Sequence, residues 1–460
     1  MTTVHDRLRV RRPLPRTSVP DTVRVAATAL APTIARGVLA RRPAAVALAE
    51  RFDADRRAGR LLRRLRTRYG SGPLRLRVPG RSLALVLSAT DVERALTGTP
   101  TPFSAAAWEK QAALGQFEPN GVLASTGPER ADRRRFNEDV LDTPETVHDL
   151  AESFATVVEE EAAILLGRVA RTGGLAWPEF RIVWWRVIRR VVLGDAARDD
   201  SEVSDMLTRL RMHANWGPAW PRRDALRRRF RTRVQSYLDA AEPGSLAAAA
   251  ARAPVTDRTD PADQMPQWLF AFEPAGMAAF RALGLLATHP EQAERAHAEA
   301  AEDGLDLPYL RACVQEAVRL WPTTLVLLRE STTETEWEDG VLPAGTGLIM
   351  LTPFLQRDEE RLPYADVFTP RIWLDGTAQA NWSLMPFSGG PAECPGRNLV
   401  LLVTSLFLAR LLRSHEYRQA AGRSLAPDRP LPRTQSPFRL RLRARPWSAT
   451  TSPWTSFAGP

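Results

Sequence analysis

Apolar residues recur at helical spacing along most of the chain, and short alternating or continuous apolar runs interrupt them in a few places. The helical periodicity predicts amphipathic helices at residues 44–68, 147–171, 177–193, 201–240, 310–320 and 398–412. Residues 267–289 are apolar on almost every side, which predicts a buried helix. Strand patterns occur at residues 325–330, 334–337, 347–350 and 438–442. The predicted fold class is mainly α with small β-sheets.

Local signals refine this outline. Apolar runs at 74–78 and 83–87 flank Pro79 and Gly80, which predicts a β-hairpin. Thr90 and Glu93 have the spacing of a helix capping box. Residues 98–125 contain Pro, Gly and Phe with weak periodicity and predict a long loop. Without an internal repeat or a clear linker, we expect an N-terminal arm over residues 1–45 and a single catalytic domain over residues 46–460.

Charge and composition exclude several classes of protein. The formal net charge of the 460 residues is +10, but nearly all of it is arginine spread along the chain, and Lys110 is the one lysine. No recognisable nucleic-acid motif accompanies it, so we expect no nucleic-acid partner. Two cysteines cannot build a disulfide framework or an iron–sulfur site. We expect a cytoplasmic monomer without a signal peptide or transmembrane segment, although an N-terminal helix on a membrane surface stays open.

The chemistry is concentrated in the segment from Phe387 to Gly396. Its cysteine, Cys394, precedes a helix that Pro395 is expected to begin, because proline favours the first helical position. The amide groups of a helix start lower the pKa of a thiol and favour thiolate. Gly390 and Gly396 permit a tight loop that can lie against a planar ligand. The alternative is a buried cysteine in a glycine-rich loop.

Phe387, Gly390, Cys394 and Gly396 match the pattern F-x-x-G-x-x-x-C-x-G. On these residues the chain resembles the cytochrome P450 family, its bacterial members in particular. The resemblance implies the cytochrome P450 fold and haem b (iron protoporphyrin IX) as cofactor. It also implies that the Cys394 thiolate is the metal ligand, and that Phe387, Gly390 and Gly396 contact the haem.

Further motifs extend the resemblance. Glu316 and Arg319 match the family's E-x-x-R, and residues three apart share a helix face, so their charges can pair. The resemblance implies that Arg371 joins them in a structural triad. It also implies that Arg329, and Arg133 or Arg134, bind the haem propionates. Ala392 departs from the family, which places Arg or His there, and the basic helix has Glu129 or Arg130 where His or Trp is usual.

The apolar helix carries the largest departure. The family's paired threonines fall on Pro274 and Ala275, while its acidic residue is present as Glu273. Proline cannot donate the backbone hydrogen bond to Phe270, so Pro274 should bend the helix while supplying no hydroxyl. Glu273 is then the best candidate for proton delivery. The alternative is a charged residue exposed to a solvent channel.

The resemblance implies a hydrophobic small-molecule substrate, bound between the loop Phe103–Phe117, the helix residues Phe270 and Glu273, and Thr323–Val326. No flavin or nicotinamide segment is recognisable in the sequence, so electrons would come from a ferredoxin and a ferredoxin reductase. The favoured function is a haem-thiolate monooxygenase, with secondary metabolism as one setting. A peroxide-using or non-redox haem-thiolate enzyme, and a non-catalytic haem protein, are the alternatives.

Overall fold

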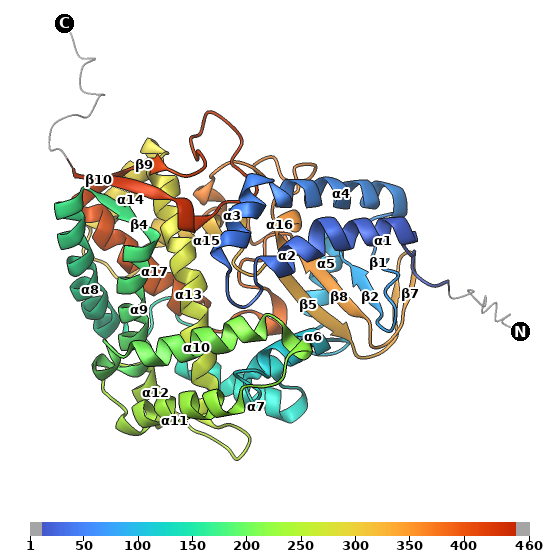
Figure 1. Cartoon of the computed structure of the whole chain (residues 1–460), viewed down its shortest axis with the longest axis horizontal. Helices are drawn as coiled ribbons and strands as arrows, with labels where there is room; N and C mark the ends of the chain where they lie inside the picture. The colour runs from blue at the N-terminus through green and yellow to red at the C-terminus, as the bar shows by residue number, and fades with distance from the viewer. Residues whose placement is uncertain (1–11, 448–460) are drawn as a thin grey trace, which may run out of the picture.

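A computed structural model describes residues 12–447 and confirms a mainly helical fold with small sheets (Figure 1). The α-helices are α1 (Val19–Val25), α2 (Ala31–Ala35), α3 (Pro43–Arg51), α4 (Ala54–Tyr69), α5 (Ala89–Thr97), α6 (Trp108–Leu114), α7 (Gly127–Val140), α8 (Ala151–Thr172), α9 (Trp177–Leu193), α10 (Ser201–Ala214), α11 (Asp224–Ala240), α12 (Leu246–Arg252), α13 (Pro261–Leu286), α14 (Pro290–Ala301), α15 (Pro308–Leu320), α16 (Thr352–Leu355) and α17 (Arg397–Ser414).

The strands form three small sheets, and the largest has the order β1-β2-β8-β5-β3. The predicted hairpin is confirmed, because Leu74 pairs with Leu85 in an antiparallel register. The strands are β1 (Leu74–Arg75), β2 (Leu83–Leu85), β3 (Phe103–Ser104), β4 (Gly174–Ala176), β5 (Val326–Ser331), β6 (Thr335–Trp337), β7 (Gly340–Leu342), β8 (Gly347–Leu351), β9 (His415–Ala421) and β10 (Arg441–Pro446).

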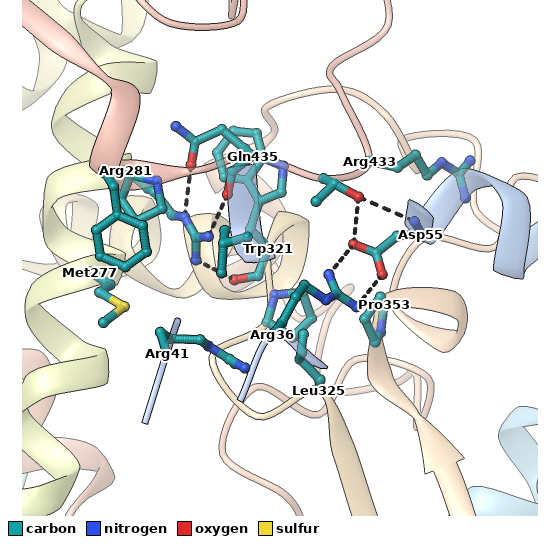
Figure 2. A pocket seen from close by; sticks show the side chains of 15 residues that line it. Arg36, Arg41, Asp55, Met277, Arg281, Trp321, Leu325, Pro353, Arg433 and Gln435 are labelled. Atoms are coloured by element: carbon teal, nitrogen blue, oxygen red, sulfur yellow. Dashed lines mark hydrogen bonds and ion pairs between the residues drawn. The ribbon is translucent and has the colours of Figure 1, made fainter. Parts of the chain in front are cut away.

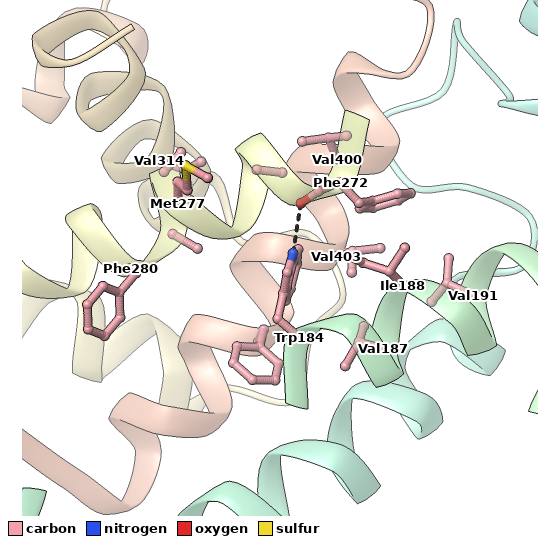
Figure 3. Close-up of a cluster of buried hydrophobic side chains, with 14 of the residues drawn as sticks. Trp184, Val187, Ile188, Val191, Phe272, Met277, Phe280, Val314, Val400 and Val403 are labelled. Carbon is pink, nitrogen blue, oxygen red and sulfur yellow. Dashed lines mark hydrogen bonds between the residues drawn. The ribbon is translucent and has the colours of Figure 1, made fainter. Parts of the chain in front are cut away.

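Helix α13 lies at the centre of the helical part, with α9, α15 and α17 packed against it (Figure 1). Their shared core includes Trp184, whose indole N–H donates to the carbonyl oxygen of Phe272 at 2.7 Å (Figure 3). The ring lies so close to α13 that a Cβ added to Gly276 would meet it at 2.4 Å. Gly276 therefore permits the close approach of α9 to α13.

Several boundaries differ from the sequence predictions. The helix expected over residues 44–68 is divided because Asp53 adopts a left-handed backbone conformation between α3 and α4. The cap of α5 is Ser88, which accepts from the Asp91 amide, so the predicted capping box is wrong. The expected loop 98–125 contains α6 and the short strand β3.

Other boundaries shift for local reasons. Helix α13 begins earlier than predicted, at Pro261, because the Asp260 side chain caps it by accepting from the Ala262 amide. A break at residues 215–223 separates α10 from α11. The final strand begins only at Arg441, because a 3₁₀ turn occupies Pro437–Arg439. Helix α12 arises in a region where the sequence showed little pattern.

The N-terminal segment packs against the rest of the protein within the described residues. Leu14 and Val25 are buried in a second hydrophobic cluster with Leu62 and Leu85. Residues 1–11 of the arm expected at 1–45 lie outside the described residues. Helix α13 is the one helix among residues 12–447 that is long and apolar enough to cross a membrane, and 83% of that stretch is buried inside the protein.

Replacement of Gly276 by alanine should lower the free energy of unfolding by about 1–3 kcal/mol, because the added methyl group overlaps the Trp184 ring. The matched control is Gly167→Ala, a mid-helix glycine in α8 whose added Cβ would meet only the Arg171 side chain at 4.0 Å. That change should stabilise the protein, by up to about 1 kcal/mol. Equal effects of the two changes on chemical denaturation would contradict the close packing of α9 on α13.

Candidate active site

Cys394 lies in a tight loop between a 3₁₀ turn, Gly390–Ala392, and helix α17. Its amide donates to the carbonyl oxygen of Phe387 at 2.9 Å, which closes the loop. The predicted helix start at Pro395 is wrong by two residues: α17 begins at Arg397, with Gly396 as its cap. Cys394 therefore lies two residues before the helix cap.

The glycine predicted to shape this loop has a specific steric role. Gly390 adopts a positive φ of 64°, and a Cβ there would lie 2.4 Å from the Leu96 carbonyl oxygen. A side chain at position 390 would therefore push the cysteine loop away from α5. Gly396 has no such restriction, because the nearest atom to its Cβ position is a Leu141 methyl group at 3.7 Å.

The electrostatics of Cys394 differ from the prediction. Burial raises the pKa of the thiol, and the Gly396 N–H together with Arg134 and Arg397 oppose that increase without reversing it. The helix start alone therefore does not generate a thiolate. A bound metal ion would, because coordination deprotonates a thiol outright.

The predicted Glu316–Arg319 pair is confirmed and completely buried. Arg319 donates to both carboxylate oxygens of Glu316, at 2.7 and 2.6 Å. It also donates to backbone carbonyls of the irregular segment that leads to Cys394, namely those of Gln356, Tyr364, Ala365 and Val367. Such a pair is satisfied on every side, as a buried ion pair requires.

The third partner of this pair is not the predicted one. Arg371 points outward, with 79% of its side chain exposed, and pairs with Asp375. Glu316 instead accepts from the indole N–H of Trp373 at 2.9 Å and from the Thr369 amide at 2.9 Å. The 3₁₀ turn Pro370–Trp373 turns residue 373 inward and residue 371 outward, so Trp373 takes the place that the prediction gave to Arg371.

A second route connects this pair to the cysteine. Gln356, whose carbonyl oxygen accepts from Arg319, uses its side-chain oxygen to accept from the Met385 amide at 3.1 Å. Met385 comes two residues before Phe387. The buried ion pair is therefore two hydrogen bonds from the start of the cysteine loop.

Arg329 is 1% exposed and contacts the cysteine loop from β5. Its guanidinium donates to the Ser388 hydroxyl at 3.1 Å and to the Thr99 hydroxyl at 2.9 Å. Burial and the nearby charge of Arg130 lower the pKa of Arg329 to about 10. Both hydroxyl partners are neutral, so they leave its positive charge uncompensated.

Two further cations accompany Arg329. Burial, Arg329 and Arg130 together lower the pKa of Lys110 to about 7, which Glu118 partly opposes. Within residues 12–447, none of the three cations forms an ion pair with a carboxylate. Haem carries two propionate carboxylates, so this cationic cluster (Lys110, Arg130 and Arg329) fits them.

The two arginines predicted for the propionates point in different directions. Arg134 donates to the carbonyl oxygen of Glu393, next to Cys394, and pairs with Glu138. Arg133 donates instead to the Ser125 hydroxyl at 2.6 Å and the Arg258 carbonyl at 3.1 Å. Arg134 thus lies against the cysteine loop, and Arg133 does not contact it.

Glu273 lies on α13 in a buried ion pair with Arg211 of α10, and Arg181 is 3.7 Å from its other oxygen. Arg211 also lies over the ring of Phe270, 4.4 Å from its centroid. Helix α13 continues without interruption through Pro274. Glu273 is only 9% exposed, so the alternative of a solvent-exposed charge is wrong.

The predicted substrate walls are only partly brought together. The rings of Phe117 and Phe270 meet edge to face at 6.0 Å. Phe103 is instead buried in the second hydrophobic cluster against Trp337, so it cannot line a substrate site. Glu118, 1% exposed, follows Phe117, and burial raises the pKa of its carboxyl well above the usual range.

Comparisons with known proteins agree with this geometry. The profile described as "Cytochrome P450" matches residues 272–440. The chain is 31% identical over 153 residues to "Cyclooctat-9-en-7-ol 5-monooxygenase" of Streptomyces melanosporofaciens, covering 31% of this chain and 33% of that protein. It is 36% identical over 155 residues to "Cytochrome P450 714C3" of Oryza sativa subsp. japonica, covering 30% of each.

The fold comparison covers far more of the chain. The solved structure titled "Retinoic acid bound cyanobacterial CYP120A1" matches with a TM-score of 0.67 and 18% identity, covering 84% of this chain and 94% of that one. The curated relatives align over about a third of their own length. Residues 272–440 therefore match the cytochrome P450 family, whose members bind haem, and the chain shares the fold of the solved structure over most of its length.

Some residues of the site could not be found from sequence. In the sequence Lys110 is an isolated lysine, and its place in the cationic cluster depends on α6, which the sequence pattern does not predict. Trp373 lies two residues after the expected Arg371, and only the 3₁₀ turn shows which of them faces inward. Arg130 had a weak signal in the sequence, since it is one of two residues, with Glu129, that could fall where the resemblance leads us to expect His or Trp.

Replacement of Trp373 by phenylalanine should lower the free energy of unfolding by about 1–3 kcal/mol, because a buried Glu316 oxygen loses a donor. Arg371→Ala is the matched control and should leave the unfolding midpoint unchanged, since Arg371 is exposed. If Arg371→Ala lowered the free energy of unfolding more than Trp373→Phe in thermal and chemical denaturation, Arg371 would be the partner of Glu316 instead.

Neutralising the cationic cluster should weaken haem retention. We expect Lys110→Gln and Arg130→Gln each to speed haem transfer to excess apomyoglobin by about tenfold or more, the effect of one lost charged hydrogen bond. Arg133→Gln serves as control and should leave the transfer rate unchanged, because Arg133 contacts Ser125 and Arg258 instead. A faster loss from the Arg133 variant than from the other two would contradict this assignment.

Proposed function

We propose that this protein is a haem-thiolate monooxygenase that oxidises a hydrophobic small molecule, with haem b as its cofactor. The observation that carries the proposal is the arrangement around Cys394: a half-buried cysteine shortly before a helix start, a loop held by the Glu316–Arg319 pair, and a cationic cluster beside it without an ion-paired carboxylate in the described chain. When bound, haem supplies an oxygen-activating iron, and a thiolate ligand favours cleavage of the oxygen–oxygen bond.

The residues around Cys394 have separate proposed roles in holding the haem and shaping the loop. Cys394 is the proposed metal ligand, with Phe387, Gly390 and Gly396 shaping the loop around it. Arg329, whose guanidinium donates to the Ser388 and Thr99 hydroxyls, would bind one propionate of the haem from β5. Arg134 fixes the loop itself through the Glu393 carbonyl.

Phe117, which is buried, and Phe270, which is partly buried, would offer apolar contact to a substrate. Glu273 is the proposed proton carrier at the position where Pro274 supplies no hydroxyl. Its carboxylate is engaged by Arg211, so proton delivery requires that pair to open. Movement of α10 relative to α13 would open it.

Electrons would come from separate proteins, a ferredoxin and a ferredoxin reductase. A second candidate function is a peroxide-driven haem-thiolate enzyme, and Pro274 favours it because the usual proton-donating hydroxyl is missing. Use of peroxide would remove the need for external electrons and for proton delivery to dioxygen.

Electron-driven and peroxide-driven turnover separate these functions. Haem-loaded protein, with a compound that shifts its spin state, is supplied either with a surrogate ferredoxin, its reductase and NADPH, or with hydrogen peroxide. Monooxygenase function predicts product only with the electron donors, and Glu273→Gln should lower the product formed per NADPH by about tenfold or more. Turnover with peroxide alone would favour the second candidate, and no product in either assay would reject both.

Asp205→Asn is the matched control, because Asp205 lies on α10 with Arg211 but forms no ion pair within the described part of the chain. That variant should keep the wild-type ratio of product to NADPH. An unchanged ratio in Glu273→Gln would remove Glu273 from proton delivery while leaving the haem-thiolate assignment intact.

A further inference from the structure

A small pocket lies between the N-terminal segment, helix α13 and the segment 433–438. It encloses about 30 Å³. Figure 2 shows Met277 and Arg281 projecting into it from α13, with Arg36 and Arg41 on the N-terminal side. Trp321, just after α15, and Leu325, just before β5, also line the pocket.

Two of the arginines in this pocket lack an acidic partner. Arg41 donates to the carbonyl oxygens of Gly37 and Thr323, both at 2.5 Å. Arg281 donates to the side chain and carbonyl of Gln435 and to the Trp321 carbonyl (Figure 2). Over residues 12–447 neither forms an ion pair with a carboxylate, and each guanidinium has five N–H groups, so both keep unused donors.

The neighbouring Arg36, unlike Arg41 and Arg281, has an acidic partner. It binds Asp55 through both guanidinium nitrogens, at 2.7 and 2.8 Å, and Asp55 also accepts from Thr434. Asp55 also lines the pocket, and this pairing engages both of its carboxylate oxygens. The charge of Asp55 is therefore shared, and the positive charge of Arg41 and Arg281 remains in excess.

Burial and neighbouring charges shift the pKa values of both arginines. Burial, together with the charges of Arg36 and Arg281, lowers the pKa of Arg41 to about 9. Burial lowers the pKa of Arg281 to about 10, although Glu50 and Asp55 oppose the decrease. Buried cations without a paired anion are costly, and an anion between them would offset that cost.

The pocket is aligned with the predicted reaction site along α13. Phe270, Pro274, Met277 and Arg281 are spaced by four, three and four residues, which places them on one helix face. Seven residues separate Pro274 from Arg281, a rise of about 10 Å along the helix. Leu325 of the pocket also belongs to the predicted substrate wall Thr323–Val326.

We propose that Arg41 and Arg281 bind the carboxylate of an amphipathic carboxylic acid whose apolar part extends along α13 toward Pro274. The space of about 30 Å³ suits a carboxylate, since a single water needs about 10–15 Å³, and is small for a phosphate or diphosphate. The proposal rests on the proposed function for the reaction at the far end, but not for the binding itself.

Spin-state titration of the haem-loaded protein tests this binding. The probes are straight-chain fatty acids from octanoic to palmitic acid, each compared with the primary alcohol of equal length. We expect at least one acid to bind about tenfold or more tightly than its alcohol, because a charged hydrogen-bonded contact contributes about 1.5–3 kcal/mol. Equal affinity of acids and alcohols, or no spectral change with any probe, overturns the proposal.

Variants then assign the preference to the pocket. Arg41→Gln should abolish the preference for acids while leaving the affinity for alcohols unchanged. Arg42→Gln is the matched control, because Arg42 is the next residue, carries the same charge and stacks on Trp216 outside the pocket. A preference that survives in Arg41→Gln, or disappears in Arg42→Gln, contradicts the assignment.

Arg281 also holds Gln435 and Trp321, so Arg281→Gln is paired with Arg281→Lys, which keeps the charge. The lysine variant should retain part of the preference for acids, and a loss equal to that of glutamine would indicate a purely structural role. The carbonyl spectrum of each reduced protein distinguishes failure of this inference from failure of the proposed function. A normal thiolate band without any preference for acids over alcohols rejects this inference alone. A missing thiolate band rejects the proposed function.

Discussion

The buried ion pair between Glu316 and Arg319 is the interaction on which the candidate site depends. Both side chains are fully buried, so each charge is stable only while the other is present. Their remaining hydrogen bonds go to the irregular segment between residues 356 and 373, which has little regular structure of its own. Through Gln356 and Met385 the same network reaches the cysteine loop. A helix thereby fixes a loop that local sequence preferences alone would leave free.

Positive charge is the second constraint. The cationic cluster beside the cysteine loop and the two unpaired arginines of the α13 pocket are buried or half-buried cations that form no ion pair within the described chain. Folding tolerates such groups only where other interactions or a ligand compensate them. The first set fits the propionates of haem, and the second fits a carboxylate of the substrate. Glu273, by contrast, is already paired with Arg211, which explains why a buried acid on α13 is compatible with a stable fold.

Much of the fold and the centre of the site could be predicted from sequence, because they depend on patterns carried by neighbouring residues. The apolar stretch of α13, the hairpin at Leu74–Leu85 and the i, i+3 pairing of Glu316 with Arg319 are of this kind. The predictions were wrong where contacts between distant segments determine which way a side chain points. Arg371 was expected beside Glu316, but a short turn places Trp373 there, and Phe103 was expected at the substrate but belongs to another cluster. Lys110 and the Arg41–Arg281 pocket depend on segments far apart in sequence, so no local pattern could reveal them.

The carbonyl spectrum of the reduced, haem-loaded protein tests thiolate ligation by Cys394 most directly, because the position of its main band reports the axial ligand. The wild-type protein should show the long-wavelength band of a thiolate-ligated haem, and the Cys394→Ser variant should lose that band. Cys313→Ser, which changes the second cysteine, should keep it. A thiolate band that persists in Cys394→Ser, or that is absent from the wild-type protein, would contradict ligation by Cys394.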